Sequence, residues 1–138
     1  MSACVLYHFA FDPGSRAVRL ALGEAKRDFT ETLVRPWEAD CPVAGLNPSG
    51  MPPVLQVGGP PALTLCEAPA ILGWIEDGQA TPLLMPSDPA ERAEVRRLTA
   101  WFDRRFTDEV NAVLLHERME KPLLRLGMLC QEVEPYLH

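Results

Sequence analysis

The chain has 138 residues, of which 47% are hydrophobic and 23% charged, and its formal net charge is −6. This balance is typical of a folded globular protein and excludes a disordered or fibrous one. A sequence pI near 5.0 argues against an electrostatic surface for nucleic acid or for anionic lipid.

The first part of the chain predicts a strand, a helix and a second strand. Residues 4–11, CVLYHFAF, are apolar on both alternating faces, which favours a strand buried between layers. Asp12 can cap the following helix and Pro13 suits its first turn, because a carboxylate satisfies an orphan amide and proline has none to satisfy. Apolar residues at helical spacing continue this helix to Ala25, and residues 28–34, DFTETLV, alternate as a strand.

The next segment is rich in turns and leads to two strands and a helix. It leaves room for one short helix near residues 39–46. PVLQV at 53–57 and ALTLC at 62–66 predict short strands, joined through GGPP, where glycine and proline favour a tight connection. EAPAILGWIED at 67–77 carries an apolar helical stripe and closes at Gly78. The predicted order is βαβ, a connecting segment and ββα, which is an α/β domain.

A linker and a long helix are predicted after this domain. Residues 79–88, QATPLLMPSD, contain three apolar anchors between turn-forming residues. Asp88, Pro89 and Glu91 then form a strong helix start, with a capping residue, a proline in the first position and an acid shortly after.

The remaining residues predict a short all-helical part. An apolar stripe predicts that the first helix extends to about Met119, and a second helix is predicted over 122–137. The stripe consists of Val95, Leu98, Phe102, Phe106, Val110, Val113 and Leu114. We therefore divide the chain into a domain at 1–78, a linker at 79–88 and a helical part at 89–138.

The cysteines and the amino terminus indicate the compartment. Cys4, Cys41, Cys66 and Cys130 form no closely spaced pair, so we predict neither a metal site nor a dithiol redox motif. A reduced, cytoplasmic chain is the simplest interpretation. The amino terminus lacks the pattern of a secretory signal, and no apolar run reaches the roughly 18 residues of a membrane span.

Five stretches, in this order along the chain, resemble the glutathione transferase family. They are LYHF, SRAVRLAL, LNPSGMPPVL, LCEAPAIL and DPAERAEVRRLTAWFD. The resemblance is greatest to the zeta-like, serine-type bacterial branch. It implies a thioredoxin-like amino-terminal domain, a linker and an all-helical domain, of which a truncated part is expected here.

The resemblance places glutathione over the amino end of the first helix. Asp12 stands where the serine-type enzymes carry their catalytic hydroxyl. A carboxylate donates no hydrogen bond, and at about 4 Å it repels a thiolate by roughly 4 kcal/mol at an effective dielectric of 20, which raises the thiol pKa. Asp12 therefore fits a helix cap better than a thiol activator. The Ser15 hydroxyl, the amides of Gly14 and Ser15, and the Tyr7 phenol are alternative donors, and Ser15 is the predicted catalytic residue.

Two further elements of the implied site also depart from the family pattern. Pro53 matches the family's cis-proline, but Pro52 replaces the usual valine and has no amide to donate. Glu67 matches the acid that meets the ligand's ammonium group, although an acid also suits a helix start, and Ala68 replaces the usual serine. At about 1 kcal/mol each, three such losses weaken binding on the order of a hundredfold.

We therefore predict a glutathione S-transferase-like protein with a degenerate glutathione site, either weakly active or serving as a non-catalytic binding or assembly module. One alternative is a competent transferase that joins the glutathione thiol to small electrophiles. Another is a folded remnant of a longer ancestral chain. The uncovered apolar stripe predicts a homodimer, because large uncovered patches usually mark an interface. The resemblance implies the same, since members of the family are commonly dimers. Glutathione is the expected ligand, and neither nucleic acid nor a membrane is an expected partner.

Overall fold

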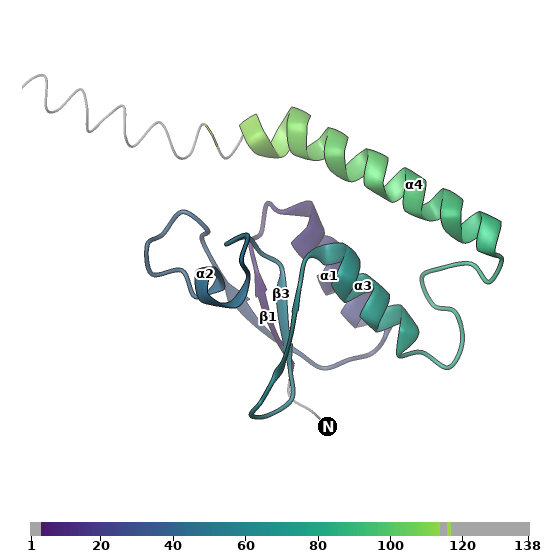
Figure 1. Ribbon diagram of the computed structural model, residues 1–138, viewed down its shortest axis with the longest axis horizontal. Helices are drawn as coiled ribbons and strands as arrows, with labels where there is room; N and C mark the ends of the chain where they lie inside the picture. Colours follow the sequence, from purple (N-terminus) through teal and green to yellow (C-terminus); the bar gives the residue numbers. More distant parts are fainter. Residues whose placement is uncertain (1–3, 114–115, 117–138) are drawn as a thin grey trace, which may run out of the picture. The chain divides into compact units, whose positions relative to one another are not determined.

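The structure is a computed structural model that describes residues 4–113 and residue 116 (Figure 1). In chain order the elements are β1 (Cys4–His8), α1 (Pro13–Glu24), β2 (Thr30–Leu33), α2 (Val43–Leu46), β3 (Val54–Val57), β4 (Leu63–Cys66), α3 (Ala68–Asp77), α4 (Pro89–Phe106) and the short π-helix η1 (Thr107–Asn111). The predicted βαβ and ββα units are therefore both present.

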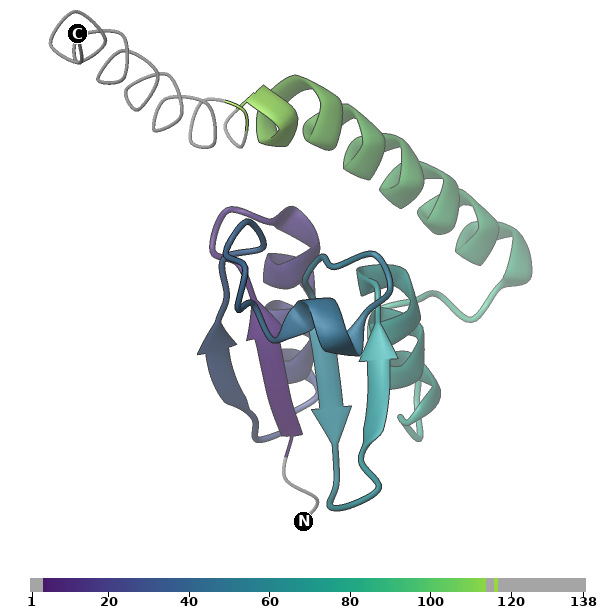
Figure 2. The ribbon, with the colours of Figure 1, turned by 60° about the vertical axis from the view of Figure 1, so that its left-hand side comes forward.

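The four strands form one mixed sheet in the order β2-β1-β3-β4 (Figure 2). β1 pairs in parallel with β2 and antiparallel with β3, and β3 pairs antiparallel with β4. At the centre, Leu6 lies opposite Glu31 on one side and Leu55 on the other. This is the thioredoxin-like arrangement, so the predicted fold class is confirmed.

Helices α1 and α3 cover one face of the sheet and form the larger core with β1 and β3. The buried residues of this core are Cys4, Leu6, Val18, Ala21, Leu22, Leu55, Ile71 and Ile75. A smaller cluster lies on the α2 side and consists of Val34, Cys41, Val43 and Val54. β1 is buried on its α1 side, whereas Val5 and Tyr7 on its other side are only half-buried. The sequence predicted that β1 is buried on both faces, but only the face toward α1 is fully buried.

The helix starts agree with the capping signals in the sequence. α1 begins at Pro13 directly after Asp12. At α4, the Asp88 carboxylate accepts hydrogen bonds from the amides of Ala90 and Glu91, each at 2.9 Å. α3 ends against Gly78, whose amide donates to carbonyl groups of the last turn. These boundaries were predictable because each depends on neighbouring residues alone.

The predicted apolar stripe of α4 is exposed. Leu98, Phe102 and Phe106 retain 39%, 60% and 45% of their surface, and no residue of α4 is buried. The described residues up to Asp103 form one compact unit, and those from Arg104 belong to a second. The predicted end of the long helix at Met119 and the predicted helix at 122–137 lie outside the described residues.

The buried Glu76 carboxylate, near the end of α3, holds the linker. It accepts hydrogen bonds from the amides of Leu83, Leu84 and Met85 at 3.2, 2.8 and 3.3 Å. Burial alone raises the pKa of Glu76, but these three donors and the charge of Arg92 outweigh it, so the pKa lies below its ordinary value. A side chain of α3 thus fixes the path of the chain toward α4.

Candidate functional site

Three of the predicted site elements meet at Gly14, in the first turn of α1. A Cβ atom placed on Gly14 would lie 3.0 Å from Ala68 Cβ, 3.3 Å from Asp12 Oδ2 and 3.6 Å from Pro53 Cδ. The turn before α1, the cis-proline loop and the start of α3 are therefore in contact. The structure brings together residues that are up to 56 positions apart in the sequence, from Asp12 to Ala68.

The amino end of α1 is closed by hydrogen bonds within the chain. Asp12 has extended backbone, and its carboxylate accepts a hydrogen bond from the Ser15 amide. Ser15 is fully buried, and its Oγ accepts a hydrogen bond from the Phe9 amide at 3.3 Å. The Ser15 amide is therefore engaged by Asp12, and the Ser15 hydroxyl has no surface from which to reach a ligand in this conformation.

The cis-proline loop lies beside this turn. The Pro52–Pro53 peptide bond is cis, and both residues are buried. Because Pro52 has no amide hydrogen, its carbonyl is the only backbone hydrogen-bonding group that it can offer to a ligand. The loop therefore has the backbone form that the resemblance implies but only half of its hydrogen-bonding capacity at Pro52.

Glu67 is held in an unusual backbone conformation at the entrance to α3. Its φ of 70° is in the left-handed region, which costs a residue with a side chain roughly 1–2 kcal/mol. Its Oε1 accepts hydrogen bonds from Asn47 Nδ2 at 3.1 Å and from Ser49 Oγ at 2.9 Å. Asn47 is itself buried and also donates to the Met51 carbonyl at 2.8 Å. These contacts orient a carboxylate that remains at the surface.

Asn47 and Ser49 are functional candidates that the sequence reasoning missed. Both lie within LNPSGMPPVL, one of the stretches that carry the family resemblance. Nothing in that stretch indicates that its side chains reach Glu67, which is 18 positions further along the chain from Ser49. The only available signal is the pairing of an Asn and a Ser, which often hydrogen-bond locally in turns.

A second carboxyl group adds to the negative charge near Asp12. Asp103 comes from α4, and partial desolvation followed by the charge of Asp12 raises the pKa of its carboxyl above the ordinary value. A thiolate bound beside Asp12 would meet the same repulsion. The electrostatics here oppose the lowering of a thiol pKa.

The side chains of Tyr7 and His8 both contact residues of neighbouring strands. The Tyr7 hydroxyl donates to Gln56 Oε1 at 3.1 Å, and the ring packs on the cluster under α2. His8 is buried, with Nε2 3.3 Å from a Glu31 carboxylate oxygen. Burial, together with the charge of Arg19, lowers the pKa of His8 although Glu31 acts in the opposite direction. The Tyr7 phenol is thus engaged elsewhere in the sheet.

The described residues provide no evidence of a metal centre or a membrane span. No group of three or more His, Cys, Asp or Glu side chains among them could hold a metal ion. In the same part of the chain, no helix is both long and apolar enough to cross a membrane.

Comparisons with known proteins agree with this fold. Residues 13–77 match the family model for the glutathione S-transferase amino-terminal domain. FtsZ-localized protein A of Caulobacter vibrioides is 56% identical over 123 residues, which is 88% of this chain and 54% of that protein. The solved structure of FzlA from C. crescentus superposes with a TM-score of 0.77 at 55% identity, covering 91% of this chain and 56% of that one.

A glutathione S-transferase from Methylobacillus flagellatus, solved with glutathione bound, has a TM-score of 0.71 at 30% identity. The match covers 83% of this chain and 55% of that structure. The fold and the site together define a class of protein, namely one with a thioredoxin-like domain and a cis-proline beside the amino end of α1. The chain belongs to the glutathione S-transferase family. It spans about half the length of FtsZ-localized protein A and of the two solved structures.

The close approach at Gly14 leads to a stability prediction. We expect Gly14→Ala to lower the free energy of unfolding by about 1–3 kcal/mol, because the added methyl group meets Ala68 Cβ at 3.0 Å. Gly23→Ala on the same helix is the matched control, since a Cβ there meets nothing within 4 Å. Urea unfolding measures both variants. Equal stability of the two variants would contradict the contact between α1 and α3.

Proposed function

We propose that this chain is a non-catalytic binding and assembly module with a degenerate glutathione site. The observation that carries the proposal is the state of Ser15, the residue predicted to activate a thiol. Its side chain is fully buried and its hydroxyl is engaged with the Phe9 amide. Its amide is occupied by Asp12. A glutathione thiolate would therefore find the Ser15 amide occupied and the Ser15 hydroxyl buried, and it would lie close to a carboxylate.

The expected affinity for glutathione supports the same proposal. Pro52 removes a backbone donor, Ala68 removes a hydroxyl and Asp12 replaces a donor with a charge of the wrong sign. Each loss costs about 1 kcal/mol, and their sum weakens binding on the order of a hundredfold. Glutathione remains the ligand of this site in the proposal, but a weakly held one.

The similarity to FtsZ-localized protein A suggests a partner. At 56% identity over most of this chain, we propose that FtsZ is the protein with which the module assembles, in the cytoplasm. We further propose that the chain forms a homodimer. The exposed Leu98, Trp101 and Phe102 on α4 support this proposal, because large uncovered apolar side chains in a row commonly mark an interface.

A weakly active glutathione transferase is the second candidate, and Glu67 is the observation that favours it. Asn47 and Ser49 hold its carboxylate in position, at an entrance to α3 where the backbone is strained. Strain of this kind persists where the surrounding structure maintains it, which is common at ligand sites. In this alternative Glu67 binds the ammonium group of glutathione, and Ser15 would have to become exposed to donate to the thiol.

Calorimetric titration with reduced glutathione separates the two candidates. For the non-catalytic module we expect no detectable heat, or a Kd in the millimolar range. The variant Pro52→Val with Ala68→Ser restores a backbone donor and a hydroxyl, and should bind at least about tenfold tighter. Micromolar binding by the unmodified chain that disappears in Glu67→Ala would contradict the proposal and support the transferase.

Sedimentation tests assembly directly. Alone at micromolar concentration, the chain should sediment as a dimer, and a stable monomer would contradict the proposed homodimer. When purified FtsZ is polymerised with GTP, the chain should pellet with the filaments. If it stays in the supernatant at every FtsZ concentration, the proposed partner is wrong.

A further inference from the structure

His8 is a buried histidine at the end of β1 that the proposed glutathione site does not use. Its side chain retains only 7% of its surface. Its Nδ1 atom is buried and has no hydrogen-bond partner among the residues that the structure describes. Most buried polar atoms in proteins have such a partner, because an unpaired one costs stability. The sheet therefore holds an ionisable ring at a position where the addition of a proton has a structural cost.

The other ring nitrogen of His8 belongs to a charged cluster that joins three elements. Nε2 lies 3.3 Å from Glu31 Oε2 on β2, and Glu31 Oε1 accepts a hydrogen bond from Arg19 Nε on α1 at 3.0 Å. Within the described part of the chain, Glu31 and Arg19 are the charged groups that act on His8. Figure 2 shows β1 and β2 side by side, with α1 behind the sheet. These three residues, the His8 cluster, thus connect α1 to the β1–β2 edge of the sheet.

The position of Glu31 determines which ring nitrogen of a neutral His8 carries the hydrogen. A lone pair on Nε2 would face a carboxylate and be repelled, so the hydrogen belongs on Nε2 and Nδ1 is the bare nitrogen. A further proton must then add at Nδ1, where the new N–H has no acceptor among the described residues. A charged His8 would therefore be paired on one side of the ring, and unpaired and desolvated on the other.

The folded chain favours the neutral form of His8. Desolvation is the largest effect, and together with the charge of Arg19 it outweighs Glu31, so the pKa of His8 lies below its ordinary value of 6.5. Between these two values the unfolded chain binds more protons than the folded chain does, and stability falls as the pH falls through this range. Above the ordinary value His8 is neutral in both states, and its contribution to stability is fully retained.

Two backbone hydrogen bonds connect His8 to the end of β2 and to α1. The His8 carbonyl accepts a hydrogen bond from the Val34 amide at 2.8 Å, directly after β2. The amide of the following residue, Phe9, donates to Ser15 Oγ on α1 at 3.3 Å. A ring that shifts to give a protonated Nδ1 an acceptor strains both bonds, because they lie on His8 and on the next residue. Protonation of His8 therefore acts on the junction between β1, β2 and α1.

We propose that the His8 cluster is a pH-sensitive contact between α1 and the β1–β2 edge. With a neutral His8 the contact is closed, and with a proton on Nδ1 the start of α1 separates more readily from that edge. Acidification would then expose the Ser15 hydroxyl more often. The inference does not require glutathione to bind, so it can fail or succeed independently of the proposed function.

Amide hydrogen exchange of the full 138-residue chain, followed residue by residue at pH 7.5 and pH 5.5, tests this contact. After correction for intrinsic exchange rates, the protection factors of Phe9 and Val34 should fall about three- to tenfold, because the folded chain excludes one proton that the open form binds. The Ile71 amide, which donates to the Glu67 carbonyl at the start of α3, should change less than about twofold, because α3 lies outside the cluster.

His8→Gln removes the proton site. Glutamine does not titrate and its amide can still face Glu31, so the protection of Phe9 and Val34 should stay constant between the two pH values. His116→Gln is the matched control, because His116 is an exposed histidine outside the cluster, and it should behave as the unmodified chain does. Near-ultraviolet circular dichroism at pH 7.5 confirms that each variant is folded.

Glu31→Gln provides a second test that leaves the histidine in place. Because Glu31 favours the charged form of His8, its removal should make the fall in protection at least as large as in the unmodified chain. A smaller fall in this variant would overturn the proposal. So would a fall that persists in His8→Gln, an equal fall at Ile71, or unchanged protection of Phe9 and Val34 in the unmodified chain.

Discussion

Two hydrogen bonds close the amino end of α1, and the proposed function depends on them. The Asp12 carboxylate engages the Ser15 amide, and the Ser15 hydroxyl engages the Phe9 amide. Together they join the end of β1 to the first turn of α1, while the bare Gly14 allows that turn to approach Ala68. The Ser15 amide, a donor that a thiolate could use, is occupied in this closure, and the Ser15 hydroxyl is buried by it. The proposed lack of thiol activation therefore has a structural cause.

Local signals made much of the fold predictable. Asp12 with Pro13 and Asp88 with Pro89 marked helix starts, because a cap and its amides lie within a few residues of each other. The candidate site was less predictable from the sequence, because its geometry depends on contacts between distant segments. Neither the burial of Ser15 nor the reach of Asn47 to Glu67 follows from periodicity or composition. These features arise only when α1, the cis-proline loop and α3 are packed together.

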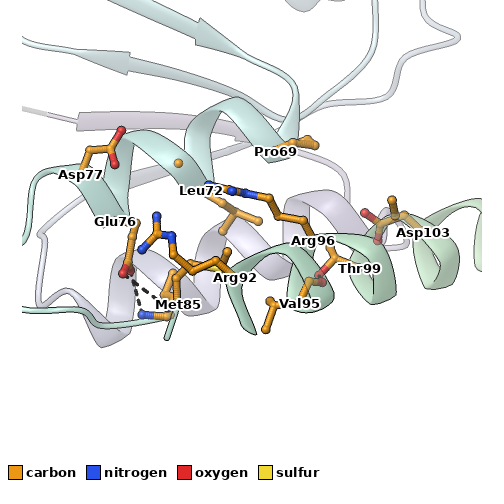
Figure 3. A pocket seen from close by; sticks show the side chains of 13 residues that line it. Pro69, Leu72, Glu76, Asp77, Met85, Arg92, Val95, Arg96, Thr99 and Asp103 are labelled. Carbon is orange, nitrogen blue, oxygen red and sulfur yellow. Dashed lines mark hydrogen bonds between the residues drawn. The ribbon is translucent and has the colours of Figure 1, made fainter. Parts of the chain in front are cut away.

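In the proposed function, the site at α1 retains a carboxylate on Glu67 that Asn47 and Ser49 orient, but it offers a bound thiol no accessible donor on Ser15. Between α3 and the part of α4 up to Asp103 lies a cavity of about 520 Å³, whose lining includes Leu72, Glu76 and Val95 (Figure 3). The Glu76 carboxylate fixes the linker that leads from α3 into α4, because it accepts hydrogen bonds from three linker amides. We propose that this scaffold serves binding and assembly rather than conjugation.

The ionisation state of the glutathione thiol tests the loss of thiol activation most directly. Ultraviolet difference absorbance of the thiolate can be followed from pH 5 to pH 10 at high glutathione concentration, with and without the protein. We expect the two titrations to coincide, because Asp12 repels the thiolate and the Ser15 hydroxyl is buried away from it. A thiolate band that grows with protein concentration and titrates near neutral pH would contradict a non-catalytic site.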